Sequence, residues 1–78
     1  MVEHKTSNLK KGDLASPLCV VIGYCLNKNE MFDVLVQPDD LLLVLRANEH
    51  EATMLCGTTI VTVPANVSWI IKNECQSL

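Results

Sequence analysis

The sequence predicts a small all-β domain, a barrel or a sandwich, and three observations support this. The chain has 78 residues, of which 49% are hydrophobic and only three are aromatic. Its core must therefore be built from Val, Leu and Ile, and β-branched side chains pack well on a pleated sheet. Short apolar runs separated by turn residues follow one another from residue 18 to residue 72. A chain of this length forms one domain with a thin margin of stability.

The two ends of the chain are more polar than its middle. Residues 1–9 are polar, and we expect them to form a mobile N-terminal arm. The single β-barrel domain then spans residues 10–73. Its first strand starts within residues 9–14, where a Gly-Asp pair supplies a turn. Residues 74–78 are expected to fray.

The run at residues 18–26 is almost continuously apolar and rich in β-branched residues, which is more typical of a strand than of a helix. Gly23 within it indicates a bulge or a bend. Side chains alternate along a strand, so its two faces carry Val20, Ile22, Tyr24 and Leu26, and Cys19, Val21, Gly23 and Cys25. Both faces are apolar, and we therefore expect a central strand or one covered by a neighbouring subunit.

A hairpin turn follows at residues 27–30, because Asn tolerates the left-handed backbone conformation that such turns need. Residues 31–37 then return as a second strand. Alternation predicts that Phe32, Val34 and Val36 face the core.

The remaining strands are bounded by Pro, Asp, Asn and Gly. A helix over residues 39–46 is the main alternative, because Leu favours helices, but the strand patterns on either side favour a strand there as well. The expected strands lie at residues 41–47, 52–56, 58–63 and 69–72, and the expected turns at 38–40, 48–51, 57 and 64–68, the last as a single 3₁₀ turn.

The close of the chain has a recognisable order of elements. Gly57 in a turn, the strand at residues 58–63, residues 64–66 (Pro-Ala-Asn) and a terminal apolar strand follow one another. This order resembles the end of SH3 and SH3-like barrels, in which a glycine turn, a strand, a Pro-x-Asn 3₁₀ turn and a last strand complete the barrel. Residues 9–14 are also similar to the first strand of small SH3-like proteins, including many from phages and bacteria. The resemblance, strongest over residues 51–72, implies an all-β SH3-like barrel of five to six antiparallel strands with a short 3₁₀ turn before the last.

Three departures from the SH3 pattern bear on the ligand. Val67 stands where peptide-binding SH3 domains have a tyrosine, no paired tryptophans lie on the central strands, and no tyrosine-rich opening strand is present. Such aromatic side chains hold a polyproline helix in its groove. The resemblance therefore implies an architecture and little about the ligand.

The charge balance disfavours nucleic acid as a partner. The formal net charge is −3, whereas nucleic-acid binding depends largely on Lys and Arg side chains that neutralise phosphates. The competing hypothesis is a small barrel that binds nucleic acid through Lys5, Lys10, Lys11, Lys28 and Arg46.

The four cysteines fit no common zinc spacing; they are Cys19, Cys25, Cys56 and Cys75. Three of them lie in apolar runs, so we expect free thiols that pack as small hydrophobes, with no metal and no cofactor. A thiol-based or metal-binding protein is the third hypothesis. The first residues show no apolar signal segment, and no apolar run approaches the roughly 20 residues that cross a bilayer. We therefore expect a cytoplasmic protein, in the host cytoplasm if it is viral.

The histidines offer little for catalysis. His4 lies in the polar arm, and His50 lies between two glutamates at the tip of an expected loop. Cys56 is close to His50 along the chain, but a reactive thiol needs an exposed, electropositive setting, and this stretch is apolar with acidic neighbours. We therefore expect a protein that is not an enzyme.

So much apolar material on so small a domain predicts a surface for other protein chains. We expect a protein-binding or accessory module that self-associates as a homo-oligomer, through an apolar surface or an exposed edge strand. The expected interface residues are Val20, Val21, Ile22, Tyr24 and Trp69. Trp69 has two interpretations, since it could anchor this interface or fill one end of the barrel as core.

Overall fold

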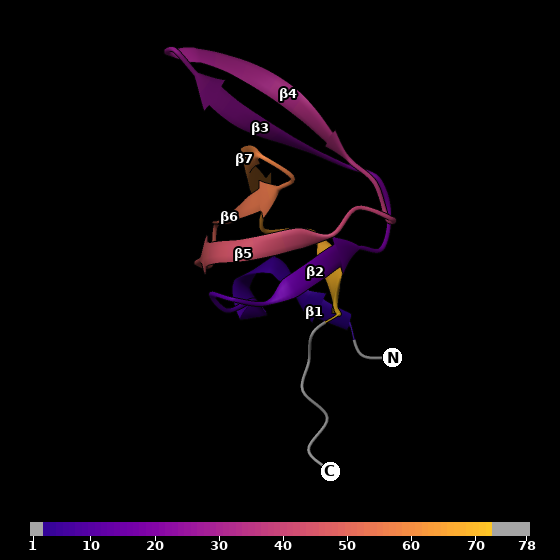
Figure 1. Cartoon of the computed structure of the whole chain (residues 1–78). Coiled ribbons are helices and arrows are strands. Elements are labelled where there is room, and N and C mark those ends of the chain that lie inside the picture. Colours follow the sequence, from indigo (N-terminus) through magenta and orange to yellow (C-terminus); the bar gives the residue numbers. More distant parts are fainter. Residues whose placement is uncertain (1–2, 73–78) are drawn as a thin grey trace.

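The structure, a computed structural model, describes residues 3–72. These residues form one sheet of eight strands and a single 3₁₀ turn, η1 (Figure 1). The elements in chain order are β1 (Glu3–Lys5), η1 (Thr6–Asn8), β2 (Leu14–Pro17), β3 (Val21–Asn27), β4 (Glu30–Val36), β5 (Leu42–Ala47), β6 (Glu51–Cys56), β7 (Thr59–Pro64) and β8 (Ser68–Ile71).

The sheet is antiparallel throughout and open. Its strand order is β1-β8-β2-β5-β6-β7-β3-β4, so β1 and β4 form the two ends. The all-β prediction is confirmed, but the predicted barrel of five to six strands is wrong. The sheet is open because these two end strands do not pair with each other. β3 joins β7 at one register position, Tyr24 with Thr62, and otherwise pairs with β4.

The N-terminal residues 3–9 belong to the sheet and do not form a separate arm. β1 pairs with β8, and both Thr6 and Leu9 are buried. The Thr6 hydroxyl accepts a hydrogen bond from Trp69 Nε1 at 2.8 Å and donates one to the Pro64 carbonyl oxygen at 2.9 Å. The Thr6 hydroxyl thus provides the hydrogen-bond acceptor for the buried indole N–H of Trp69. The predicted fraying of residues 74–78 lies outside the described residues.

The 3₁₀ turn is also not where the sequence places it. It lies at Thr6–Asn8, whereas residues 65–66 form a simple turn that leads into β8. The Thr6 backbone N–H donates to the Val67 carbonyl oxygen at 3.2 Å, which joins the two turns. Both turns therefore belong to one packed end of the molecule.

The core is aliphatic apart from one tryptophan and one methionine. Trp69 is fully buried, so in this structure it fills the core. The buried hydrophobic residues are Leu9, Ala15, Val21, Val36, Leu42, Val44, Ala52, Met54, Val61, Val63, Val67 and Trp69.

The turns agree with the sequence pattern. Lys28 and Asn29 have φ of 53° and 68°, as a two-residue type I′ turn requires, and they connect β3 to β4. Residues 48–51 connect β5 to β6, and Gly57, with φ of 64°, lies between β6 and β7. Residues 42–47 form β5, so the helical alternative for this region is wrong.

Candidate binding surface

The β3–β4 hairpin projects from the rest of the sheet, which we call the body. Figure 1 shows it as a long ribbon above β5, β6 and β7. Each of its strands has seven residues, and they pair with each other along their whole length. Only Tyr24, in the middle of β3, is in register with the body. The hairpin is therefore anchored at its centre and base, and its turn end extends past β7.

Gly23 makes this anchorage possible. A Cβ atom at this position would lie 2.6 Å from Val61 Cγ1 and 2.7 Å from the Thr62 carbonyl oxygen, closer than side chains approach. The pairing of β3 with β4 runs through Gly23 without a shift, so this glycine is not a bulge. It marks the place where the backbone of β3 lies against β7.

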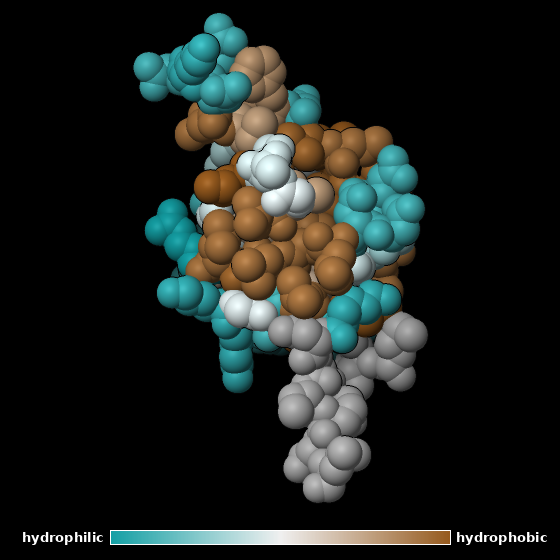
Figure 2. All heavy atoms as spheres, in the orientation of Figure 1, coloured by the Kyte–Doolittle hydropathy of each residue, from teal (hydrophilic) through white to brown (hydrophobic). Residues whose placement is uncertain are grey.

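One face of the hairpin, which we call the outer face, is apolar and exposed. Ile22 pairs with Leu35 and Leu26 with Met31, and these side chains are 64%, 55%, 68% and 64% exposed. Tyr24 and Asp33 form a pair between them. Figure 2 shows a hydrophilic turn end and apolar surface gathered over the middle of the molecule.

The opposite, inner face is covered only near the base of the hairpin. Val36 is fully buried and Val34 is half-buried, as predicted for core-facing residues. Phe32, predicted to face the core as well, is 45% exposed. Its side chain is on the inner face, but its cross-strand partner Cys25 lines an open groove with residues 58–60, so the body does not close on the hairpin at this level. The turn end of the hairpin thus exposes apolar side chains on both faces.

The predicted interface residues are in two different environments. Val20 and Ile22 are exposed and Tyr24 is half-buried. Val21 and Trp69 are buried within the chain and so do not form part of its surface. Val21 is on the inner face, where the body covers the base of the hairpin.

The sequence interpretation missed the contribution of β4 to the exposed surface. Met31, Phe32 and Leu35 are all exposed. The cross-strand register set by the two-residue turn was the signal that could have found them, because it places Met31 and Leu35 on the same face as Leu26 and Ile22.

Open grooves border the hairpin. One, of about 480 Å³, lies between the segment leading into β3 and the β7–β8 turn. Another, of about 250 Å³, lies between β3 and the loop that carries His50. Ile22 and Pro64 line both. A further groove, of about 340 Å³, separates the turn end of β3 from residues 58–60. The groove beside the His50 loop has polar side chains among its lining residues, namely Tyr24, His50, Glu51 and Thr62, but its volume is below the roughly 300–1,000 Å³ of most small-molecule sites.

The side chains of the nucleic-acid hypothesis are spread over the molecule. Lys5 lies on β1 and Lys28 at the hairpin turn, at opposite ends of the sheet. Lys10 and Lys11 lie between η1 and β2, and Arg46 lies on β5. The fold therefore does not bring these five side chains to one face.

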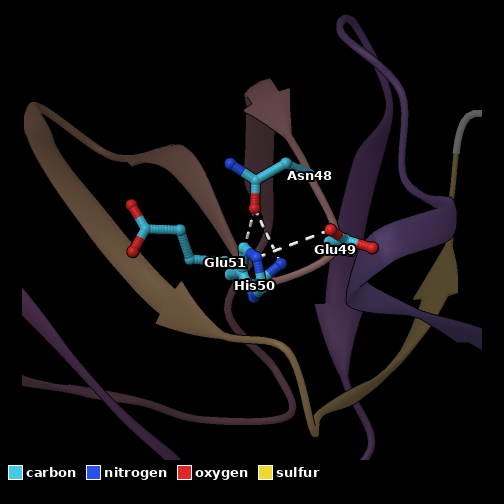
Figure 3. A network of polar contacts seen from close by, with 4 residues as sticks. All are labelled: Asn48, Glu49, His50 and Glu51. Carbon is cyan, nitrogen blue, oxygen red and sulfur yellow. Dashed lines mark hydrogen bonds and ion pairs between the residues drawn. The ribbon is translucent and has the colours of Figure 1, made fainter.

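The loop at residues 48–51 is held by hydrogen bonds between its own backbone and the Asn48 side chain (Figure 3). The Asn48 side-chain oxygen accepts hydrogen bonds from the backbone N–H groups of His50, at 2.7 Å, and Glu51, at 2.9 Å. His50 Nε2 lies 3.5 Å from Glu49 Oε1, and both side chains are exposed. These contacts explain the loop as a capped turn. Within residues 3–72, no group of three or more His, Cys, Asp and Glu side chains is placed to hold a metal ion.

Cys25 and Cys56 are half-buried, whereas Cys19 is exposed, so the expectation that Cys19 packs as a small hydrophobe is wrong. Cys75 lies outside the described residues. Burial raises the pKa of the Cys56 thiol, and the Asp40 carboxylate raises it further. The Cys56 thiol is therefore protonated at neutral pH, which is the unreactive form. None of the helices in the described part of the chain is long and apolar enough to cross a membrane.

No protein-family model, no curated protein and no solved structure matches this chain. The similarity to SH3-like barrels stays a prediction from the sequence.

Proposed function

We propose that this protein is a non-enzymatic binding module that associates with protein through the β3–β4 hairpin, and that it self-associates. The observation that carries the proposal is the turn end of the hairpin, where Leu26 and Met31 on one face and Phe32 on the other are exposed. Large apolar side chains gathered on a projecting element mark protein interaction surfaces.

The energetics favour a partner with an apolar surface of its own. Covering one large apolar side chain contributes about 1.5–3 kcal/mol. Because Leu26, Met31, Phe32 and Leu35 are 45–68% exposed, covering all four would contribute on the order of 3–7 kcal/mol. Association itself costs about 4–15 kcal/mol in lost freedom. A second copy of the chain covers these side chains and has the same side chains of its own covered. The free energy gained by burial therefore exceeds the cost of association most readily in a symmetric pair.

The environment of the other candidate groups supports a role without catalysis. Cys56 is held as a neutral thiol, and His50 lies in an exposed, internally capped loop. Glu49 lies beside His50, but both side chains are exposed, and within residues 3–72 neither has a nucleophile beside it, which covalent catalysis needs.

The test is a double variant that places a charge on each face of the hairpin, Ile22→Lys with Phe32→Lys. Sedimentation velocity over a range of concentrations should show self-association of the wild type, weakened at least tenfold in this variant, because a factor of ten needs only about 1.4 kcal/mol. The matched control, Ser7→Lys with Asn8→Lys, adds the same charge at exposed positions of η1, on the body. It should associate like the wild type. A wild type that stays monomeric, or a control that is weakened equally, would contradict the proposal.

A further inference from the structure

The edge of β4 that faces away from β3 has no partner strand within residues 3–72. β4 is the last strand of the sheet order, and it is seven residues long. A long exposed edge with apolar side chains is a template for another strand. Asp33 and Glu30 are the only charged residues on it.

The turn determines which backbone groups point to this edge. In a type I′ turn the first residue accepts a hydrogen bond from the fourth, so the N–H of Glu30 points to β3. The direction alternates along an antiparallel strand. Met31, Asp33 and Leu35 therefore direct their N–H and C=O groups to the free edge.

From this edge, we infer that the partner is a second copy of the chain, joined antiparallel along β4 with Val34 of each copy opposite Val34 of the other. The inference rests on the proposed self-association and specifies its geometry. In this register Phe32 lies opposite the partner's Val36, and Asp33 opposite the partner's Leu35. Because Asp33 and Leu35 are the outward-pointing residues, they form the hydrogen-bonded pairs.

The symmetric registers closer to the hairpin turn are worse. A two-fold axis at Asp33 places the two carboxylates directly opposite each other, and like charges in that position are destabilising. An axis at Phe32 places Glu30 opposite the apolar Val34 and runs the next residues into the positive-φ turn. The axis at Val34 places apolar residues opposite each other at every inner-face position of the overlap.

Two features at the ends of the hairpin fit this arrangement. Phe32, exposed although it is on the inner face, comes beside the end of the partner's β4 that is packed on the partner's core. The hairpin turn, with Lys28, comes level with residues 39–40 of the partner, which are two aspartates in the turn after β4. Lys28 of each copy is therefore the charged residue that pairs with the aspartates of the other copy, and the pairing occurs twice by symmetry. Glu30 comes level with Pro38.

Cysteine cross-linking of the full chain tests the register. Opposite residues of a non-hydrogen-bonded pair have Cα atoms about 4.5 Å apart, within the range that a disulfide bridges. Under mild oxidation, Val34→Cys should form a covalent dimer whose disulfide maps by mass spectrometry to position 34 of both copies. The matched control is Phe32→Cys on the same face, made together with Cys25→Ser because Cys25 lies opposite position 32 within the hairpin. Its two copies would be about 13 Å apart along the strands and should not cross-link with each other.

A second pair of variants keeps the test independent of thiol chemistry. Leu35→Pro removes an N–H that points to the partner and leaves the β3–β4 ladder intact, whereas Leu35→Ala keeps the N–H. Leu35→Pro should weaken self-association at least tenfold more than Leu35→Ala, with unchanged circular dichroism. The proposed function stands if the wild type associates and the double lysine variant does not. This register is nevertheless wrong if position 34 fails to cross-link and the two Leu35 variants associate equally. A wild type that is monomeric at every concentration overturns both.

Discussion

The body and the β3–β4 hairpin contain the same kinds of residues but are stabilised differently. In the body, β5, β6 and β7 pair along their lengths and bury one face, which carries Val44, Met54 and Val61. The hairpin pairs just as completely, yet most of its large apolar side chains are exposed. An isolated two-stranded hairpin is at best marginally stable in water. The hairpin therefore depends on its contact with β7, and the body does not depend on the hairpin tip.

The largest effect is expected where the two regions meet. Gly23→Ala would place a methyl group against the Thr62 backbone oxygen, which cannot move aside as a side chain can. We expect a loss of about 3 kcal/mol in the free energy of unfolding, at the upper end for overpacking. Chemical denaturation followed by Trp69 emission measures it.

The control for this prediction is Gly57→Ala. Gly57 has a positive φ, but nothing lies within 4 Å of an added Cβ. Gly57→Ala should lower the free energy of unfolding only by the backbone strain of an alanine with positive φ, about 1–2 kcal/mol. Equal losses in the two variants would mean that β3 does not pack closely on β7.

The contrast between the two regions also explains what the sequence could and could not predict. The turns at residues 27–30, 48–51 and 57 were predictable because Asn and Gly determine a turn locally. The pairing of β1 with β8 was not, because it joins residues more than sixty positions apart through the Thr6 hydroxyl and the Trp69 indole. Alternation placed Phe32 and Val36 on one face correctly, but it contains no information on how far the body extends beneath that face.

The same limit applies to the binding surface. Ile22 and Val20 are exposed and Val21 is buried, but the sequence did not separate the three in a strand with two apolar faces. That the sheet stays open was equally invisible, because it depends on whether the end strands β1 and β4 meet, and no local pattern in the sequence determines that.

A smaller effect is expected inside the body, at the hydrogen bond that holds the N-terminal segment. Thr6→Val keeps the shape of the side chain but leaves the buried Trp69 N–H without an acceptor, which costs about 1–3 kcal/mol. Thr6→Ser keeps the hydroxyl and loses one methyl group, worth about 0.8 kcal/mol. Thermal unfolding should therefore rank the wild type above Thr6→Ser and Thr6→Val last. A serine variant less stable than the valine variant would show that packing, and not the hydrogen bond, holds residues 3–9.

The smallest effect separates the two regions most directly. Asn29 has a φ of 68°, and Asn29→Ala should cost about 1 kcal/mol because alanine disfavours the left-handed conformation. If the turn end opens on its own, the cost appears as roughly fivefold faster hydrogen exchange of amides near that end, since 1.4 kcal/mol corresponds to tenfold. The slowest amides of β6 and β7 should change by the same factor only if the whole chain opens together. Asn29→Gly, which adopts this conformation freely, is the control and should leave both groups of amides close to the wild type. Equal acceleration in the hairpin and the body would mean that the hairpin unfolds only with the body, so that its exposed side chains are held in place without a partner.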